Sequence, residues 1–381
     1  MEFAYTEEHA LIRNTIRSFM ENEVAPYVAE WDRAHVFPDT VIRRLGELGF
    51  LGATVPESYG GTPIDSIGMA IAIEEMARIS ASVAITVSVH TGLACQAIAT
   101  YATPSAKQRY LPRMARGEWL GAFALSEPQA GSDAGAVQTR AERRGDEYIL
   151  NGTKVWVTNG EKAHVLVVHA VTDPTAGKRG LSSFIVETDW PGVHIGRNED
   201  KLGLCSSVTN TISLTDCRVP VENRLGEEGE GLKIALSTLA TGRIGVAAQA
   251  VGIAQGAFEH AIRYATERKT FGRYLYEHQA IQFMLAEMAT RIEAARLLTH
   301  RAAWLRDTRR PYHVAASMAK LFASEMCQRV TYLAMQIYGG YGYSRDYPVE
   351  RYFRDGRITT IYEGTSEIQR IIIARHLLAF G

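Results

Sequence analysis

The sequence predicts an α+β protein made of a helical part, a strand-rich part and a second helical part, in that order. Apolar residues recur at helical spacing up to about Trp119, alternate as in strands from Leu120 to about Leu225, and return to helical spacing from Gly229 onward. Strands and helices do not alternate along the chain, which excludes a doubly wound parallel sheet. We expect three domains, at residues 1–119, 120–226 and 227–381.

The N-terminal part shows a helical pattern from Thr6 onward. Its apolar positions follow helical spacing at Leu11, Ile12, Ile16, Phe19 and Met20. Farther along, Thr103 has the side chain of a helix N-cap, and Pro104 fits the first helical turn. These two residues predict a short basic helix that ends at Arg116.

The middle part predicts a hairpin and several further strands. Asn151-Gly152 lies between two apolar runs, residues 148–150 and 153–157, and Asn-Gly is a strong signal for a two-residue hairpin turn. Further strands are expected at Val165–His169, Ser183–Glu187 and Thr209–Leu214.

The C-terminal part consists of long helical segments joined by short connections. We expect helices at residues 232–268, 277–307 and 312–339, and a last helix from Thr365. Long helices with short connections are typical of an antiparallel bundle.

Charge and composition exclude several classes of function. Lysine and arginine number 41 and aspartate and glutamate 42, so the net charge of −1 gives no electrostatic reason to expect nucleic acid or an anionic membrane as a partner. The stretch Ser80–Ala106 lacks charged residues but has too many polar side chains for a membrane span, so we expect buried helices there. The four cysteines are too few for a disulfide framework or a cysteine-rich zinc site, which favours a reducing compartment.

The N-terminal segment and the motif search give negative results. The segment MEFAYTEEHA lacks a basic region and an apolar core, so no secretory or transit peptide is expected. The chain has no G-x-G-x-x-G, P-loop, H-E-x-x-H or G-x-S-x-G motif, and no two of its 11 histidines lie three or four residues apart. We expect no metal site, and a nucleotide would need a binding site other than a Rossmann turn or a P-loop.

Several segments combine glycine with hydroxyl, aromatic or charged residues, as binding sites do. They are residues 123–133, 156–160, 268–272, 336–340 and 361–367. Glycines at helix ends leave backbone N–H groups free for anionic ligands. Each segment alone also fits a structural role: Trp156 fits a core, Arg268 a solvated helix end, and Glu363 the first turn of a helix.

In combination and in this order, these segments resemble the acyl-CoA dehydrogenase family. The resemblance covers nearly the whole chain and rests on FALSEPQAGSDAG, KVWVTNG, ERKTFG, EHQAIQFMLAEM, QIYGGYGYSRDYPVER and IYEGTSEIQR at family-like spacing. It implies the acyl-CoA dehydrogenase fold, with an N-terminal helical domain, a middle β-barrel-like domain and a C-terminal four-helix bundle. It also implies α,β-dehydrogenation of a saturated acyl-CoA thioester to the trans-2-enoyl-CoA, with FAD as hydride acceptor and electron-transferring flavoprotein as the electron partner.

The resemblance assigns the catalytic base to Glu363. A carboxylate beside the thioester would remove the α-proton while hydrogen-bond donors stabilise the enolate charge on the carbonyl oxygen. In the family these donors are the backbone N–H of the base and a ribityl hydroxyl of the flavin. Some branches of the family carry the base at the position of Gly242, so Glu363 is the only candidate here.

The resemblance also assigns the flavin contacts. In the middle part they are Phe123, Leu125, Ser126, Ser132, Trp156 and Thr158. Contacts to the FAD of a neighbouring subunit are Arg268, Phe271, Gln279, Gln336, Gly339 and Gly340, and contacts near the pyrophosphate and adenosine are Thr365 and Glu367. One chain would then hold only part of a FAD site, which implies a homodimer or homotetramer.

Substrate-side positions of the family fall on Ser132, Arg243 and Gly364. Ala240 departs from the acidic residue common in medium-chain relatives, so the matching CoA contact is not expected. The stretch Ser80–Ala106 that would line the acyl pocket has no cation, which disfavours a dicarboxylic substrate. We expect a short or short branched acyl chain, with a medium chain as the alternative.

Two other functions stay open. An acyl-CoA oxidase or a flavin-dependent hydroxylase would use the same fold but pass electrons to oxygen. A non-catalytic flavoprotein that binds DNA or another protein would need a basic face, which the net charge of −1 does not favour. The absence of a leader favours the cytoplasm, although a processed protein of the mitochondrial matrix would have the same sequence.

Overall fold

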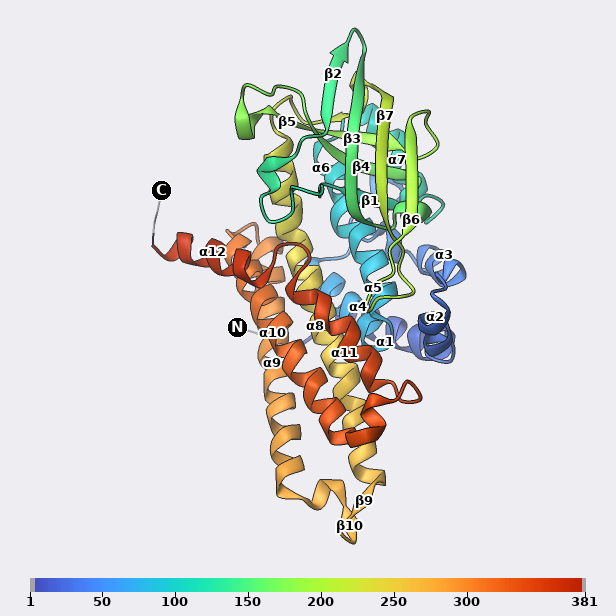
Figure 1. Ribbon diagram of the computed structural model, residues 1–381, viewed down its shortest axis with the longest axis vertical. Coiled ribbons are helices and arrows are strands. Elements are labelled where there is room, and N and C mark those ends of the chain that lie inside the picture. Colours follow the sequence, from blue (N-terminus) through green and yellow to red (C-terminus); the bar gives the residue numbers. More distant parts are fainter. Residues whose placement is uncertain (1–3, 379–381) are drawn as a thin grey trace.

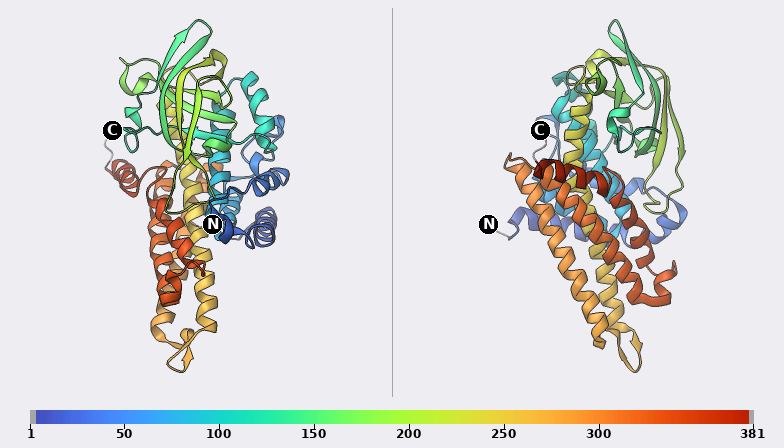
Figure 2. Two further views of the ribbon diagram at one scale, coloured as in Figure 1. Left: turned by 45° about the vertical axis from the view of Figure 1, so that its right-hand side comes forward. Right: turned by 60° about the vertical axis from the view of Figure 1, so that its left-hand side comes forward.

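A computed structural model describes residues 4–378. Residues 1–3, which begin the segment MEFAYTEEHA, and residues 379–381 lie outside the described residues. The molecule is elongated, with a β-sheet at one end and long helices at the other (Figures 1 and 2). Its helices are α1 (Glu7–Phe19), α2 (Val28–Ala34), α3 (Asp39–Glu47), α4 (Ser66–Ile79), α5 (Ala81–Ser88), α6 (Gln96–Tyr101), α7 (Pro104–Ala115), α8 (Gly231–Glu267), α9 (Gln279–Asp307), α10 (His313–Tyr338), α11 (Val349–Arg357) and α12 (Ser366–Leu377). Its strands are β1 (Gly121–Ala124), β2 (Arg140–Arg144), β3 (Glu147–Thr158), β4 (Val165–Val171), β5 (Leu181–Glu187), β6 (Val193–Asn198), β7 (Thr209–Pro220), β8 (Arg224–Leu225), β9 (Lys269–Thr270) and β10 (Arg273–Tyr274).

The N-terminal helices share one hydrophobic core with the C-terminal bundle. Leu45, Met76 and Val83 from the N-terminal part are fully buried in this core together with Val251 of α8. The predicted start of α7 is confirmed, because the backbone N–H of Ala106 donates a 3.2 Å hydrogen bond to the Thr103 hydroxyl. The two helical parts are therefore packed as one body, with the sheet above them.

Two helical stretches, Ala81–Tyr101 and Gly231–Glu267, are long and apolar enough to cross a membrane by length and composition alone. Within the molecule, 78% and 72% of their most apolar windows are buried. Core helices of a folded domain pass the same test, and the first stretch lies within the segment for which buried helices were predicted.

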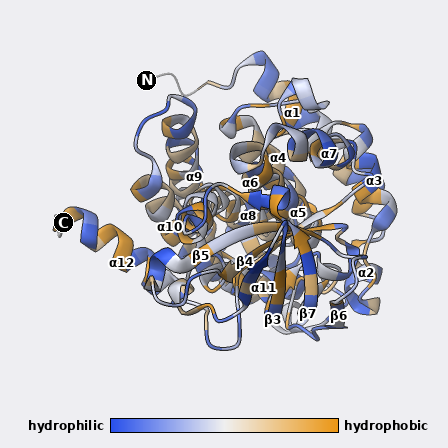
Figure 3. Cartoon of the chain, turned by 90° about the horizontal axis from the view of Figure 1, so that it is seen from above, coloured by the Kyte–Doolittle hydropathy of each residue, from blue (hydrophilic) through white to orange (hydrophobic). Residues whose placement is uncertain are grey.

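The middle part is built on an eight-stranded sheet in the order β6-β7-β3-β2-β4-β5-β8, with β1 paired to β4. β1 runs parallel to β4, whereas β3 is antiparallel to both β2 and β7. Both hydrophobic and hydrophilic residues occur along β3 and β7 (Figure 3). In β7, Ile212, Leu214 and Val219 are buried while several of the residues between them are half-buried or exposed, as expected for a strand with one buried face. The three strands predicted after the hairpin are confirmed, because they lie within β4, β5 and β7.

The predicted hairpin turn at Asn151-Gly152 is wrong. β3 continues through both residues, and β2 and β3 are instead joined at Gly145-Asp146, where Gly145 has a φ of 64°. A Cβ atom at Gly152 would lie 2.4 Å from the hydroxyl oxygen of Thr139, and the pairing of β3 with β7 shifts register at this point. Glycine is required here for a bulge and a close backbone approach, which depend on the missing Cβ just as a turn does.

The C-terminal bundle is formed by α8, α9, α10 and α11. The first three have bounds within two residues of those predicted. The sequence analysis did not predict α11, which packs against both α8 and α10, because this short helix carries mainly charged residues and has no long apolar pattern. The helix expected from Thr365 is present as α12, but it projects from the body beside α10 instead of joining the bundle (Figure 1).

Candidate active site

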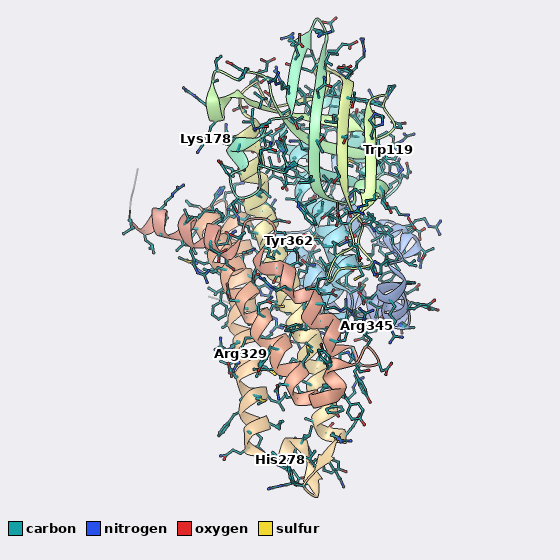
Figure 4. The ribbon with its side chains drawn as sticks, in the orientation of Figure 1. Trp119, Lys178, His278, Arg329, Arg345 and Tyr362 are labelled. Atoms are coloured by element: carbon teal, nitrogen blue, oxygen red, sulfur yellow. The ribbon has the colours of Figure 1, made fainter. Side chains whose placement is uncertain are left out.

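Glu363 lies in a short loop before α12, close to the middle of the molecule, where Figure 4 labels the adjacent residue Tyr362. Glu363 has a φ of 50° and Gly364 a φ of 94°, so two consecutive residues are left-handed. For a residue other than glycine, a sparsely populated backbone conformation costs about 1–3 kcal/mol. The residue as a whole is half-buried, but both carboxylate oxygens are buried and have no hydrogen-bond partner within residues 4–378.

The Glu363 carboxylate lies against Gly242 of α8. A Cβ atom at Gly242 would be 2.1 Å from Oε2 of Glu363 and 2.8 Å from Cδ2 of Leu93. Any larger residue at position 242 would therefore displace the carboxylate or Leu93. The structure thus brings together the two positions that the sequence analysis considered for the base, with glycine at one and the carboxylate at the other.

Two cationic side chains contribute to the electrostatics of this carboxylate. Burial raises the pKa of Glu363 to about 7, while the charges of Lys320 and Arg243 act in the opposite direction. Arg243 is buried on α8, and its Nε has no partner among the described residues. Burial lowers the pKa of Arg243, and the Glu363 charge partly offsets this effect. A carboxyl group that titrates near neutral pH is suited to accept a proton from a substrate.

The sequence analysis missed Lys320. This lysine on α10 is fully buried, and its Nζ donates a 2.8 Å hydrogen bond to the carbonyl oxygen of Gly364. The same carbonyl accepts a 2.9 Å hydrogen bond from Nε2 of Gln369 on α12. The only sequence signal was a single lysine among the small and apolar residues of Ala315–Ala323.

The residues predicted to contact flavin in the middle part are placed by the ends of β1 and β3. The backbone N–H of Val155 donates a 2.9 Å hydrogen bond to the carbonyl of Ser126, which joins the loop after β1 to β3. Trp156 has a φ of 58°, and 64% of its surface is exposed. Of the others, Leu125 is buried, Ser132 is exposed, and Phe123, Ser126 and Thr158 are half-buried.

A buried ion pair holds this loop in place. Nζ of Lys154 lies 2.7 Å from Oε1 of Glu127, and the other Glu127 oxygen accepts a 2.7 Å hydrogen bond from the backbone N–H of Gln138. Burial lowers the pKa of Lys154 to about 8, and the Lys154 charge helps to lower the pKa of Glu127. Both groups are therefore charged at neutral pH, and Lys154 also donates to the carbonyl of Leu125.

The residues predicted to contact the FAD of a neighbouring subunit lie at the tip of the bundle. Arg268, Gly339 and Gly340 line a cavity of about 450 Å³ at the tip of the bundle, where the Arg268 guanidinium lies 5.5 Å from the ring centre of Tyr341. Phe271 is 96% exposed. Gln279 and Gln336 are also exposed; Figure 4 labels His278, the residue before Gln279, at this tip.

The structure therefore divides the predicted site residues into separate groups. Thr365, whose hydroxyl accepts from the N–H of Ile368 as the cap of α12, and the exposed Glu367 lie beside Glu363 and Gly364. The sheet group lies where β1 and β3 meet the helices, and the bundle-tip group lies at the far tip of the bundle, beside β9 and β10 (Figure 1). The exposed aromatic ring of the sheet group offers a surface on which a flavin ring could stack, and the arginine of the bundle-tip group offers a positive charge for an anionic group.

The described residues show no metal-binding site. Within residues 4–378, no group of three or more His, Cys, Asp or Glu side chains is placed to hold a metal ion. The four cysteines are buried and carry free thiols.

Comparison with protein families connects this geometry to known proteins. Sequence profiles described as acyl-CoA dehydrogenase N-terminal, middle and C-terminal domains match residues 6–118, 122–217 and 229–378. The chain belongs to the acyl-CoA dehydrogenase family. The recognition made from its motifs is confirmed, as are the fold and the general activity: the chain is an acyl-CoA dehydrogenase.

Curated members of this family match nearly the whole chain. The mitochondrial short-chain specific acyl-CoA dehydrogenase of Mus musculus is 47% identical over 98% of this chain and 90% of its own length. The short-chain specific acyl-CoA dehydrogenase of Clostridium acetobutylicum is 46% identical over 98% of this chain and 99% of its own length. The acryloyl-CoA reductase (NADH) of Anaerotignum propionicum is 46% identical over 99% and 96%.

Solved structures of acyl-CoA dehydrogenases are equally similar. Butyryl-CoA dehydrogenase from Megasphaera elsdenii has a TM-score of 0.97 and 43% identity over 99% of this chain and 100% of that one. A chain from work on the electron-transferring flavoprotein of Acidaminococcus fermentans has a TM-score of 0.98 and 48% identity over 99% and 100%. An acyl-CoA dehydrogenase from Bacillus anthracis, complexed with FAD, has a TM-score of 0.93 and 37% identity over 98% and 67%.

Proposed function

We propose that this acyl-CoA dehydrogenase oxidises a short or short branched saturated acyl-CoA to the trans-2-enoyl-CoA, with Glu363 as the base. The observation that carries the proposal is the partnerless, buried Glu363 carboxylate lodged against Gly242. A base of this kind is poised for a substrate that enters the site, because it makes no competing hydrogen bond within residues 4–378. The short-chain specificity of the relatives from Mus musculus and Clostridium acetobutylicum supports the chain-length class.

In this proposal the α-proton of the thioester passes to the Glu363 carboxylate. The negative charge that develops on the thioester oxygen needs a hydrogen-bond donor, and the backbone N–H of Glu363 has no backbone acceptor among the described residues. Arg243 and Gly364 lie beside Glu363 and would contact the substrate; Ser132, in the sheet group, would contact it from the other side. Closure of the site around the thioester would exclude water and keep the pKa of Glu363 raised, at about 7.

The groups around Trp156 and Arg268 fit FAD, with the sheet group of one subunit and the bundle tip of its neighbour completing each site. FAD, when bound, supplies the acceptor for the β-hydrogen as a hydride. The FAD-bound relative from Bacillus anthracis supports this cofactor, and the structure from Acidaminococcus fermentans supports electron-transferring flavoprotein as the partner. The assembly would be a homodimer or homotetramer.

The proposal also includes the cellular compartment and the domain boundaries. The relatives carry a mitochondrial name in Mus musculus and a bacterial source in Clostridium acetobutylicum. We place the enzyme in the cytoplasm, or in the mitochondrial matrix if a leader was removed, and divide its domains at residues 119/120 and 226/227.

Anaerobic bleaching of the flavin by a panel of acyl-CoAs of increasing length tests the proposal. The parent protein should be bleached fastest by short saturated acyl-CoAs, and Glu363→Gln should be slower by about 10²–10⁴-fold because an amide cannot accept the proton. A yellow protein that no acyl-CoA bleaches would contradict the activity. Preference for a medium chain would correct the substrate class, and rapid formation of hydrogen peroxide on re-oxidation would indicate an oxidase.

A further inference from the structure

The loop that carries Glu363 is held by side chains from two neighbouring helices. Lys320 of α10 and Gln369 of α12 both donate to the carbonyl of Gly364, at 2.8 Å and 2.9 Å. Gln369 also reaches the carbonyl of Glu363 itself, at 3.4 Å. Since Glu363 and Gly364 are consecutive left-handed residues, these contacts oppose relaxation of the loop.

Lys320 is the unusual member of this set, because it brings a positive charge into the interior. Its side chain is fully buried, and within residues 4–378 its ammonium group donates a single hydrogen bond, to the carbonyl of Gly364. The charged groups that act on it are Glu363, Arg243 of α8, Glu325 of α10 and Glu367 of α12. Burying an ammonium group is costly unless a compensating charge lies close by. Among the charged groups around Lys320, Glu363 has the largest electrostatic effect on it.

We propose that Lys320 is the positioning residue of the catalytic base: its ammonium group fixes the carbonyl of Gly364 and, by its charge, favours the ionised form of the Glu363 carboxylate. The inference rests on the function proposed above. Lys320 would not touch the substrate; it acts through the loop and through its electrostatic effect on Glu363.

The charge of Lys320 has a definite direction of effect. A nearby cation favours the ionised form of a carboxyl group, whereas burial disfavours it. Lys320 is the larger and Arg243 the smaller of the two cationic influences that lower the pKa of Glu363 against the effect of burial. Loss of the Lys320 charge therefore raises the pKa of Glu363, and a larger part of the base is protonated and inactive at neutral pH.

Three variants separate charge, hydrogen bond and packing. Lys320→Gln removes the charge and keeps a hydrogen-bond donor, and Lys320→Met removes both. Ser324→Ala is the matched control: Ser324 lies one turn farther along α10, is fully buried, and donates a 2.8 Å hydrogen bond to the carbonyl of Thr359. The control therefore loses a buried contact of the same kind without a change in charge.

The rate of flavin bleaching by the best acyl-CoA would be measured against pH for each purified holoenzyme. For Lys320→Gln and Lys320→Met we expect the midpoint of the profile to move up by about one to three pH units, so that the rate below the parent midpoint falls at least about tenfold. Lys320→Met should also have a lower rate at the high-pH plateau, because the loop is no longer fixed. Ser324→Ala should keep the parent midpoint.

Infrared titration of the carboxyl stretch provides a second readout that does not depend on turnover. The band lost in Glu363→Gln identifies the group, and its titration midpoint should move up in both Lys320 variants. Unchanged midpoints in Lys320→Gln, by rate and by infrared titration, would overturn the inference even if Lys320→Met does not fold. A parent protein that no acyl-CoA bleaches would instead contradict the proposed function, and the infrared result would still decide whether Lys320 controls the ionisation of Glu363.

Discussion

At the scale of single residues, the main feature of the candidate active site is a carboxylate in an energetically unfavourable environment. Glu363 has a left-handed backbone and two buried oxygens without a partner among the described residues. This arrangement lowers the stability of the folded protein, and it does so most when the carboxyl group is ionised. The same properties make the carboxylate available to a substrate proton, so stability and activity are opposed at this residue.

Glu363→Gln should therefore make the protein more stable at alkaline pH. The pKa of Glu363 is raised from 4.5 to about 7 in the folded protein, so the native state binds the proton more tightly and the free energy of unfolding falls as the pH rises between these values. At about 1.4 kcal/mol per pKa unit, the variant should exceed the parent by up to about 3 kcal/mol above pH 7 and show no such advantage below pH 4.5. Urea unfolding of both holoenzymes across this range measures the difference; parallel curves would contradict the assignment.

At the scale of elements, the loop after β1 is kept in place by the buried Glu127–Lys154 pair. Lys154 lies on β3 and binds both the Glu127 carboxylate and the carbonyl of Leu125. The ion pair thus connects a strand to the loop that carries the predicted flavin contacts. Removal of one partner leaves an uncompensated buried charge, which is more damaging than removal of both.

Lys154→Met should cost about 3–5 kcal/mol of stability and reduce the flavin content of the purified protein. Glu127→Gln combined with Lys154→Met should recover much of the stability, because no buried charge is then left unpaired. Arg144→Met, which removes an exposed ion pair with Glu142 on β2, is the control and should leave stability nearly unchanged. Thermal unfolding and flavin absorbance measure both effects, and equal losses in the single and double variants would count against the ion-pair explanation.

At the scale of the whole molecule, the two groups of predicted flavin contacts come from different parts of the fold. The Trp156 group lies near the end of β3, where Asn159 donates to the carbonyl of Thr86 on α5, and the Arg268 cavity lies at the tip of the bundle (Figures 1 and 2). Exposed aromatic residues also gather at that tip, Phe271 above all. A second copy of the chain that brings its bundle tip to the sheet group would complete both sites by symmetry.

Mixed oligomers of two defective variants test this arrangement. Trp156→Ala and Arg268→Glu should each retain little FAD alone. With random pairing, co-expression should restore about a quarter of the parent flavin content in the whole pool and about half in the mixed dimers, since each mixed dimer has one intact site of two. Flavin content after co-purification through two different tags measures the recovery. No recovery in mixed oligomers would mean that each site lies within one chain.

Local features of the sequence predicted much of the fold. Thr103 and Pro104 specify a helix start by their own chemistry, and the periodicity of residues 231–338 specifies long helices, because these signals act within a few turns. The prediction failed where one local signal fits two structures: glycine at 152 permits a turn or a bulge, and Thr139 across the sheet decides between them. The short α11 has a local signal, because Val349 and Tyr352 lie on one helical face, but two apolar positions among mainly charged residues are too few to predict a helix.

The candidate site shows the same division. The motif around Glu363 pointed to the base through family resemblance, and Gly242 was recognised as a position where no carboxylate stands. Lys320 escaped notice, because a lone lysine in a helix has many roles and its burial becomes visible only when α10 packs against the loop before α12.

The sequence by itself determined the order of helical, strand-rich and helical parts, the family and the identity of the candidate base. Only the tertiary structure decided that Glu363 rests on Gly242, that Lys320 lies beside its loop, and that the predicted flavin contacts fall in separate groups beside the sheet and at the tip of the bundle. Periodicity and capping depend on neighbours within a few residues, and motifs record residue types in order. Burial and the pKa of Glu363 depend on segments that are distant in the chain and meet only after folding.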